Sequence, residues 1–392
     1  MPIADQTPSS PLLPRRLGDL VTPGLLLDQD RLERNVARMR DRLTRLNVGF
    51  RPHLKTAKSI EVARRVMDRP SGPAMVSTLR EAEYFADHGV RDLTYGVGIA
   101  PGKLDRIGAL RRHHGVELTI ILDSLEQAEA VAVWSTAQGY RLPVLIEIDA
   151  DGHRSGVPPE DGERLIAIGR KLHDGGSALR GVLTHAGDSY TLSRPDDLAA
   201  AAAAERTAAV GAGEILRAAG LPCPVVSIGS TPTASFAQDL AGVTELRAGV
   251  FMFGDLVQTG IGACTSNDIA ISVLATVIGH QRAKGWTIVD AGWMALSRDR
   301  GTSRQAVDQG YGLVCDEAGA PFPDLLVLDA NQEHGIIGAR PGSGEKPPDL
   351  PVGSLVRILP NHACATAAQH DRYHVLAPDR RVIAQWPRIG GW

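Results

Sequence analysis

The chain has 392 residues, of which 43% are hydrophobic and 22% charged, and its formal net charge at pH 7 is -3. This composition is ordinary for a globular enzyme, and the length allows one large α/β barrel plus a smaller domain. Charges of both signs are spread along the chain and aromatic residues make up only 4%. Neither a nucleic acid nor a membrane surface is therefore an expected partner.

Residues 1–20 are rich in Pro and Ser and lack the hydrophobic core of a secretory signal, so we predict a flexible N-terminal arm. No apolar run approaches the roughly 20 residues that span a bilayer. Cys223, Cys264, Cys315 and Cys364 lie far apart without C-x-x-C spacing. They are expected to be thiols or ligands rather than disulfides, and the chain is expected to be cytoplasmic.

From about residue 22 to 250, short β-rich runs alternate with longer amphipathic stretches. An opening strand at 24–27 and a helix from about Asp30 to Leu43 precede eight strand–helix units. The eight strands are expected to begin near Val48, Ala74, Asp92, Glu117, Pro143, Arg180, Pro224 and Thr244. Eight such units predict a TIM (β/α)8 barrel. A doubly wound open sheet gives a similar alternation and stays open as the alternative.

After residue 265 the runs become short, β-branched and interrupted by Gly, Pro and Asp, as at 269–279, 285–290, 325–328 and 354–359. This sequence pattern predicts a separate, mostly antiparallel β-domain. The expected division is an arm at 1–20, a barrel at 21–260 and a β-domain at 261–392, with the boundary near Gly260–Asp268. The opening strand could also join the β-domain.

The basic octapeptide Arg51–Lys58 follows the first barrel strand. A lysine at the mouth of a strand, flanked by His and Thr, could form a Schiff base, although such a charge run also fits a solvated loop. In a βα barrel the chemistry gathers on the loops after the carboxyl ends of the strands. That location favours a reactive lysine here.

The loops after strands seven and eight of such barrels often bind a phosphate. Strand seven is followed here by Gly229-Ser230-Thr231, which offers backbone N–H groups and two hydroxyls to an anion. Gly249, after strand eight, would allow the second loop to approach closely. An ordinary turn with a helix cap is the alternative reading of the first loop.

A reactive lysine and a phosphate site on one face of a barrel suggest pyridoxal phosphate. A Schiff-base sugar aldolase would use the same two parts, but it would leave His185 and Arg154 unexplained. An imidazole can stack on a pyridine ring, and an arginine can pair with the ring phenolate. Buried structural roles are the alternative for both residues.

A second group of residues lies in the β-domain, at 360–366. If this segment is a strand, His362 and Cys364 point to the same face. Imidazole plus thiolate suits a divalent metal such as zinc or a related transition ion. Two ligands are fewer than the four of structural zinc, so water or substrate oxygens would have to complete the shell. The alternative is a buried cysteine beside a hydrogen-bonded histidine.

Eight motifs together resemble the fold-type III pyridoxal-phosphate enzymes, within them the branch of the D-serine dehydratases and D-threonine aldolases, and most of all its D-threo-3-hydroxyaspartate dehydratase members. They keep their order over nearly the whole chain after about residue 20. The motifs are R-P-H-L-K-T-A-K, D-G-H-R-S-G-V, T-H-A-G-D-S-Y, G-S-T-P-T, R-A-G-V, D-A-G-W-M, N-Q-E-H-G and P-N-H-A-C.

The resemblance implies an alanine-racemase-like barrel plus a β-domain, and a homodimer whose active sites lie between one barrel and the partner's β-domain. It also implies which residues contact the cofactor. Lys55, not Lys58, would carry it, Arg154 would meet the phenolate, His185 the ring face and Tyr190 the pyridine nitrogen. The implied phosphate ligands are Gly229, Ser230, Thr231, Gly249 and Val250.

The resemblance further implies a divalent metal (Zn, Mn, Mg or Co) on His362 and Cys364. In the implied reaction, Lys55 removes the Cα proton from a 3-hydroxy D-amino acid such as D-threo-3-hydroxyaspartate or D-serine. The metal assists loss of the β-hydroxyl, and the products are a 2-oxo acid and ammonia.

Three rival functions remain at this point. A D-threonine aldolase would use the same cofactor and metal, but several aldolases of the family carry His-x-Asp, so Cys364 favours dehydration. A racemase would need a second base on the opposite face and no metal. A non-enzymatic pyridoxal-binding homeostasis protein shares the barrel but lacks the β-domain that is expected after Gly260.

Overall fold

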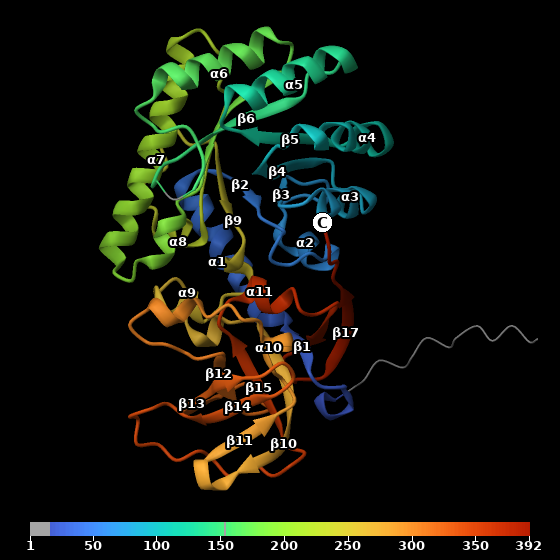
Figure 1. Ribbon diagram of the computed structural model, residues 1–392, viewed down its shortest axis with the longest axis vertical. Coiled ribbons are helices and arrows are strands. Elements are labelled where there is room, and N and C mark those ends of the chain that lie inside the picture. Colours follow the sequence, from blue (N-terminus) through green and yellow to red (C-terminus); the bar gives the residue numbers. More distant parts are fainter. Residues whose placement is uncertain (1–15, 153) are drawn as a thin grey trace, which may run out of the picture.

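The computed structural model describes residues 16–152 and 154–392, and the predicted arm at 1–20 lies largely outside this range. Two units are stacked along the long axis of the molecule, with the barrel at one end and the β-domain at the other (Figure 1). Within the described range, no helix is long and apolar enough to cross a lipid bilayer.

The barrel consists of eight parallel strands. From β3 to β9 each strand pairs with the next along the chain, and β2 pairs with β9. A single bridge between His53 and Met75 links β2 to β3, so the barrel is nearly closed. This closure excludes the doubly wound open sheet. The strands are β2 (Gly49–Pro52), β3 (Ala74–Val76), β4 (Asp92–Gly98), β5 (Glu117–Leu122), β6 (Pro143–Ile148), β7 (Ala178–Thr184), β8 (Val225–Ile228) and β9 (Glu245–Ala248).

Helices cover the outside of the barrel, and their ends follow local sequence signals. Ser124 caps α5 by accepting a hydrogen bond from Gln127 N, and Asp161 caps α6 in the same way through Arg164 N. The helices are α1 (Gln29–Leu46), α2 (Ile60–Val66), α3 (Leu79–Asp87), α4 (Leu104–His114), α5 (Leu125–Gln138), α6 (Gly162–Asp174), α7 (Pro195–Ala218), α8 (Thr231–Phe236) and α9 (Leu256–Gly260). The Ala-rich segment 199–204 lies within α7, in keeping with the high helix propensity of alanine.

Short 3-10 helices connect several of these elements. They are η1 (Leu17–Asp19), η2 (Pro101–Lys103), η3 (Gly187–Thr191), η4 (Val250–Met252), η5 (Ser266–Asp268), η6 (Arg282–Lys284) and η7 (Gly301–Arg304). Three of them, η3, η4 and η7, carry residues of the site described below.

Side chains alternate between the two faces of each barrel strand. On β5, Ile120 and Leu122 pack in the large core under the helices, whereas Ile121 belongs to a separate cluster inside the barrel. This inner cluster comprises Met75, Ile121, Leu145 and Leu183. It forms an apolar floor between the two mouths of the barrel.

The second unit is a nine-stranded sheet in which all pairings are antiparallel except that of β1 with β16. Strand β1 comes before the barrel in the sequence but lies in this sheet, between β10 and β16. The strands are β1 (Gly24–Asp28), β10 (Ile271–Gln281), β11 (Trp286–Val289), β12 (Gly312–Cys315), β13 (Pro321–Ala330), β14 (Gly335–Ala339), β15 (Leu355–Pro360), β16 (Arg372–Leu376) and β17 (Val382–Pro387). Two short helices, α10 (Trp293–Leu296) and α11 (Ala363–Ala367), complete the unit.

The two units meet at the carboxyl ends of the barrel strands, where α11 faces the barrel (Figure 1). Tyr373 of β16 donates a hydrogen bond from its hydroxyl to Ala57 O (2.7 Å), and Ile389 N donates to Lys58 O (2.9 Å). The β-domain therefore holds the turn that follows β2.

Candidate active site

A cavity of about 800 Å³ lies between the carboxyl ends of the barrel strands and the β-domain. All eleven residues that the sequence singled out line its wall: Lys55, Arg154, His185, Tyr190, Gly229, Ser230, Thr231, Gly249, Val250, His362 and Cys364. The fold thus gathers residues that are more than three hundred positions apart, such as Thr56 and Cys364, into one space. Their individual roles stay predictions.

The two lysines of the octapeptide have different environments. Lys58 Nζ lies 3.1 Å from Oε1 of Glu81, whose side chain is fully buried. Lys55 is exposed to the cavity and forms no ion pair with any described residue. Leu54, between β2 and Lys55, is buried in the core and donates its N–H to Met75 O (2.8 Å). The amine of Lys55, unlike that of Lys58, therefore has no carboxylate partner among the described residues.

The loops after β8 and β9 form a close-fitting turn at the predicted phosphate site. Gly229 has φ of 133°, and a Cβ atom there would lie 2.1 Å from Arg247 O, so no other residue fits. At Gly249 a Cβ atom would lie 3.0 Å from His53 O. The two glycines allow the three loops to approach closely enough to surround a small anion.

The backbone donors of this turn differ from those expected. Gly229 N donates to Glu205 Oε1 (3.0 Å) and Ser230 N donates to Thr233 Oγ1 (3.0 Å), so neither N–H group is free. Within the described protein, the N–H groups of Gly249 and Val250 have no hydrogen-bond acceptor. A phosphate would therefore be bound by these two N–H groups and by hydroxyls.

Tyr190, in η3, contacts the same turn. Its hydroxyl hydrogen-bonds to the backbone and side chain of Thr231, and burial raises its pKa. The phenol therefore stays protonated and lies against the predicted phosphate site. Its predicted contact with a pyridine nitrogen remains a prediction.

His185 directly follows β7. Its Nδ1 donates a hydrogen bond to Gly229 O (3.0 Å). Burial, together with the positive charges of Lys55 and Arg154, lowers the pKa of His185 to about 3. The ring is thus neutral near pH 7 and fixed in orientation, which suits stacking on a pyridine ring.

Arg154 and Glu147 lie on the same side of the cavity. Arg154 Nη2 is 3.8 Å from Glu147 Oε1, and the Arg154 side chain is 54% exposed whereas that of Glu147 is buried. Burial raises the pKa of Glu147, and the charge of Arg154 opposes that shift. Arg154 is therefore available to a phenolate while Glu147 keeps it near the cavity wall.

His362 and Cys364 do not lie on a strand, so the prediction that strand geometry points both side chains to one face is wrong. His362 is the N-cap residue of α11, and Cys364 is the second residue of that helix. Their side chains nevertheless meet in a hydrogen bond. Cys364 Sγ also lies 3.1 Å from Thr56 Oγ1 of the barrel, one residue after Lys55.

The donor chemistry of this pair fits a metal site with two protein ligands. Burial opposes the shift, but His362 lowers the pKa of Cys364 and favours the thiolate. His362 Nδ1 hydrogen-bonds to Asp299 Oδ2 (2.6 Å), an arrangement that orients metal-binding histidines. The described residues contain no group of three or more His, Cys, Asp and Glu side chains placed to bind a metal ion. Water or substrate oxygens would have to supply the remaining ligands.

The sequence analysis assigned no role to three residues of the site. Glu205 of α7 is buried and accepts from the N–H groups of Ala186 and Gly229, so it holds two cavity loops together. The sequence signal for Glu205 was a single carboxylate on the buried face of an Ala-rich helix. Arg247 is buried beneath the cavity and donates to Ser227 Oγ (2.7 Å) and Thr184 O (2.5 Å). Asp299 lies in a polar loop and had no distinguishing signal.

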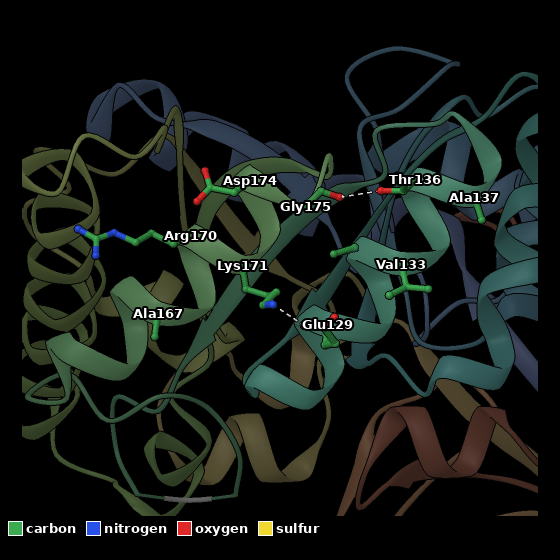
Figure 2. A pocket seen from close by; sticks show the side chains of 10 residues that line it. Glu129, Val133, Thr136, Ala137, Ala167, Arg170, Lys171, Asp174 and Gly175 are labelled. Carbon is green, nitrogen blue, oxygen red and sulfur yellow. Dashed lines mark hydrogen bonds and ion pairs between the residues drawn. The ribbon is translucent and has the colours of Figure 1, made fainter.

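A second hollow lies on the outside of the barrel, between α5 and α6 (Figure 2). Its wall contains the Lys171–Glu129 ion pair and a hydrogen bond from Thr136 Oγ1 to Gly175 O. It contains none of the predicted site residues. The chemistry therefore concentrates in the cavity between the two units.

Comparison with known families gives two matches along the chain. A family model described as "Alanine racemase, N-terminal domain" matches residues 27–257. A second, described as "Putative serine dehydratase domain", matches residues 270–376. The two matches correspond to the barrel and to most of the β-domain.

Similar proteins cover almost the whole chain. D-threo-3-hydroxyaspartate dehydratase of Delftia sp. (strain HT23) is 53% identical over 95% of this chain and 98% of that protein. D-serine dehydratase of Dictyostelium discoideum is 29% identical over 96% and 98%, respectively. D-threonine aldolase of Arthrobacter sp. is 26% identical over 89% and 87%. Sequence identity is thus higher to these two dehydratases than to this aldolase.

Solved structures agree with this pattern. D-threo-3-hydroxyaspartate dehydratase from Delftia sp. HT23 has a TM-score of 0.93 and 53% identity, covering 96% of this chain and 100% of that one. An enzyme of the same name is solved as a His-to-Ala mutant (TM-score 0.94, 52% identity, 97% of both chains). It is also solved as a Cys-to-Ala mutant in the metal-free form (0.93, 52%, 96% and 100%). The two mutated positions are separated by one residue.

Proposed function

The chain belongs to the alanine-racemase-like family of fold-type III pyridoxal-phosphate enzymes, and on this basis we propose that it is a metal-dependent dehydratase of 3-hydroxy D-amino acids. The substrates are D-threo-3-hydroxyaspartate or D-serine, and the products are a 2-oxo acid and ammonia. The name of the similar Delftia enzyme supports this substrate class.

One observation carries the proposal: the His362–Cys364 pair of the β-domain lies in the same cavity as Lys55 of the barrel. Cys364 contacts Thr56, the residue next to Lys55. Dehydration needs a base at Cα and an electrophile at the β-oxygen in one space. A pyridoxal enzyme that acts only at Cα would not need the second group.

The cavity fits pyridoxal phosphate by its residues. Lys55 offers a free amine for the aldehyde, the Gly229 and Gly249 loops surround the phosphate position, and the neutral ring of His185 faces the space between them. When bound, pyridoxal phosphate supplies an electron sink for the charge left at Cα, and a divalent metal supplies a Lewis acid for the departing hydroxyl.

The protein's own residues would then perform the proton transfer and the positioning. Lys55 Nζ accepts the Cα proton, because it is the cavity amine that no carboxylate neutralises. Loss of this proton and of the β-hydroxyl removes one water from the substrate. The enamine that is released takes up water and yields the 2-oxo acid and ammonia, so the reaction needs no oxidant.

The second candidate is D-threonine aldolase activity, because the same lysine and metal pair could support cleavage of the Cα–Cβ bond. Incubation with D-serine, D-threonine and D-threo-3-hydroxyaspartate separates the two. A dehydratase releases ammonia and a 2-oxo acid from the substrates that it accepts. Release of glycine and acetaldehyde from D-threonine would assign the protein as an aldolase instead, and inactivity toward all three would reject both functions.

The metal is Zn, Mn, Mg or Co, since imidazole plus thiolate accepts several divalent ions. The enzyme is a cytoplasmic homodimer. All eleven site residues come from the barrel and the β-domain of one chain, so the partner's β-domain would add to this site rather than form it. Four free cysteines support a reducing compartment, and gel filtration with a mass measurement tests the dimer.

A further inference from the structure

The loop that contains η7 is fastened to the segment that carries the metal pair. Asn361, which precedes His362 and is buried, accepts from Thr302 N (2.9 Å) and donates to Thr302 Oγ1 (2.8 Å). Asp299, at the start of the loop, hydrogen-bonds to His362 Nδ1 (2.6 Å). Any group on η7 that faces the cavity is therefore held at a fixed position relative to His362 and Cys364.

Arg304, the last residue of η7, is such a group. It lines the cavity and is exposed to it. Among the described residues, none forms a hydrogen bond or an ion pair with its side chain, whereas the neighbouring Arg300 pairs with Asp308 (2.6 Å). An arginine without a partner at the wall of an active-site cavity is available to a ligand carboxylate.

Two carboxylates of the cavity wall, Glu147 and Asp255, have other partners. Glu147 lies beside Arg154. Asp255 accepts hydrogen bonds from Ala363 N (2.9 Å) and Gln258 N (2.8 Å). Among the described residues, no carboxylate pairs with Arg304, so its positive charge is available to a substrate.

The position of Arg304 determines whether it can contact the α-carboxylate or the β-carboxylate of the substrate. In 3-hydroxyaspartate, the β-carbon carries both the hydroxyl, which must lie at the His362–Cys364 pair, and the second carboxylate. That carboxylate is therefore close to the metal pair, on the side of the cavity to which η7 is fastened. D-Serine has only a hydrogen at this place and offers the arginine nothing to bind.

We propose that Arg304 is the specificity-determining residue that binds the β-carboxylate and makes dicarboxylic 3-hydroxy amino acids the preferred substrates. This inference rests on the proposed function for its reaction, but its binding component can be measured without turnover. D-Aspartate and D-alanine differ in the β-carboxylate and lack a leaving group, so their binding can be followed through the absorbance of the pyridoxal holoenzyme.

The experiment compares the wild-type holoenzyme with Arg304→Gln, Arg304→Lys and the control Arg298→Gln. Arg298 lies near the same loop, stacks on Trp293 and does not line the cavity. Arg304→Gln should raise the Kd of D-aspartate, and lower kcat/KM for D-threo-3-hydroxyaspartate, by roughly 10- to 100-fold, the size of one charge-assisted hydrogen-bonded pair. The values for D-alanine and D-serine should stay within about twofold.

Arg304→Lys should be intermediate, because it keeps the charge but loses the two-pronged geometry. Arg298→Gln should match the wild type. An equal loss for the mono- and dicarboxylic compounds would overturn the proposal, since it would assign Arg304 to the α-carboxylate that they share, and no loss for either would also overturn it. If the wild type turns over neither hydroxy acid, the proposed function fails, while the D-aspartate and D-alanine titrations still decide the role of Arg304.

Discussion

The barrel and the β-domain each supply half of the candidate site, but they position their residues in different ways. In the barrel, each site residue follows a strand of a repeated βα unit, so the parallel sheet itself brings Lys55 and His185 to one mouth. In the β-domain, His362 lies at the start of a short helix and is oriented by Asp299, 63 residues earlier. A regular scaffold therefore makes site positions recognisable from the sequence pattern, whereas a side-chain network does not.

The two regions also contain different parts of the predicted site. The barrel contains the predicted contacts to pyridoxal phosphate, and the β-domain contains the predicted metal ligands and Arg304. They are joined at the turn after β2, where Tyr373 and Ile389 hydrogen-bond to the carbonyls of Ala57 and Lys58. Variants that remove the cofactor attachment and the metal ligands separately test this division between barrel and β-domain.

The largest expected effect is that of Lys55→Ala, which acts on the barrel half alone. Loss of the amine removes both the attachment point of the aldehyde and the base, so activity should fall by at least about 10³- to 10⁴-fold. The absorbance band of the lysine-bound cofactor, near the visible edge, should disappear from the purified protein. Metal binding, measured by competition with a coloured chelator, should be retained.

Lys58→Ala is the matched control for that variant. The cofactor band should persist, because Lys58 is paired with Glu81 and not with the cofactor. The free energy of unfolding should fall by roughly 2–3 kcal/mol, somewhat less than for a fully buried pair, because Lys58 keeps partial exposure. If Lys58→Ala loses the band and Lys55→Ala keeps it, the assignment of the two lysines is reversed.

The second expected effect concerns the metal and acts on the β-domain half alone. Chelator treatment, or Cys364→Ala, should reduce ammonia release by about 10²- to 10³-fold, because the hydroxyl is a poor leaving group without a Lewis acid. The cofactor band should be unchanged, and adding back a divalent ion should rescue the chelated wild type but not the variant. A fully active metal-free enzyme would contradict the metal-assisted reaction.

The smallest expected effect is that of Asp299→Asn, which leaves both ligands in place and changes only the support of His362. The side chain of Asn is similar in size, but it no longer carries the charge that orients and polarises the imidazole. Metal affinity should fall by about 10- to 100-fold, as for other carboxylates that support a metal-bound histidine. Activity at saturating metal should recover most of its wild-type value. An unchanged metal affinity would show that Asp299 has only a structural role.

Much of the fold was predictable, because the eight barrel strands begin within about two residues of their expected starts. The four β-rich runs predicted after residue 265 coincide with β10, β11, β13 and β15. The expectation of a strand at His362 was wrong, since a helix of only five residues follows it and such a short element leaves no readable period.

By itself, the sequence determined which residue types were available for chemistry and the βα alternation that places Lys55, His185 and Gly229 at one end of a barrel. That part could be read locally, because strand and helix periodicity depend on near neighbours in the chain. Only the tertiary structure decided that Lys58 pairs with Glu81, that Glu205 accepts from the N–H of Gly229, and that Arg304 faces the cavity with no partner among the described residues. The physical reason is that these pairings depend on burial and on contacts between distant segments, which no local pattern of side chains encodes.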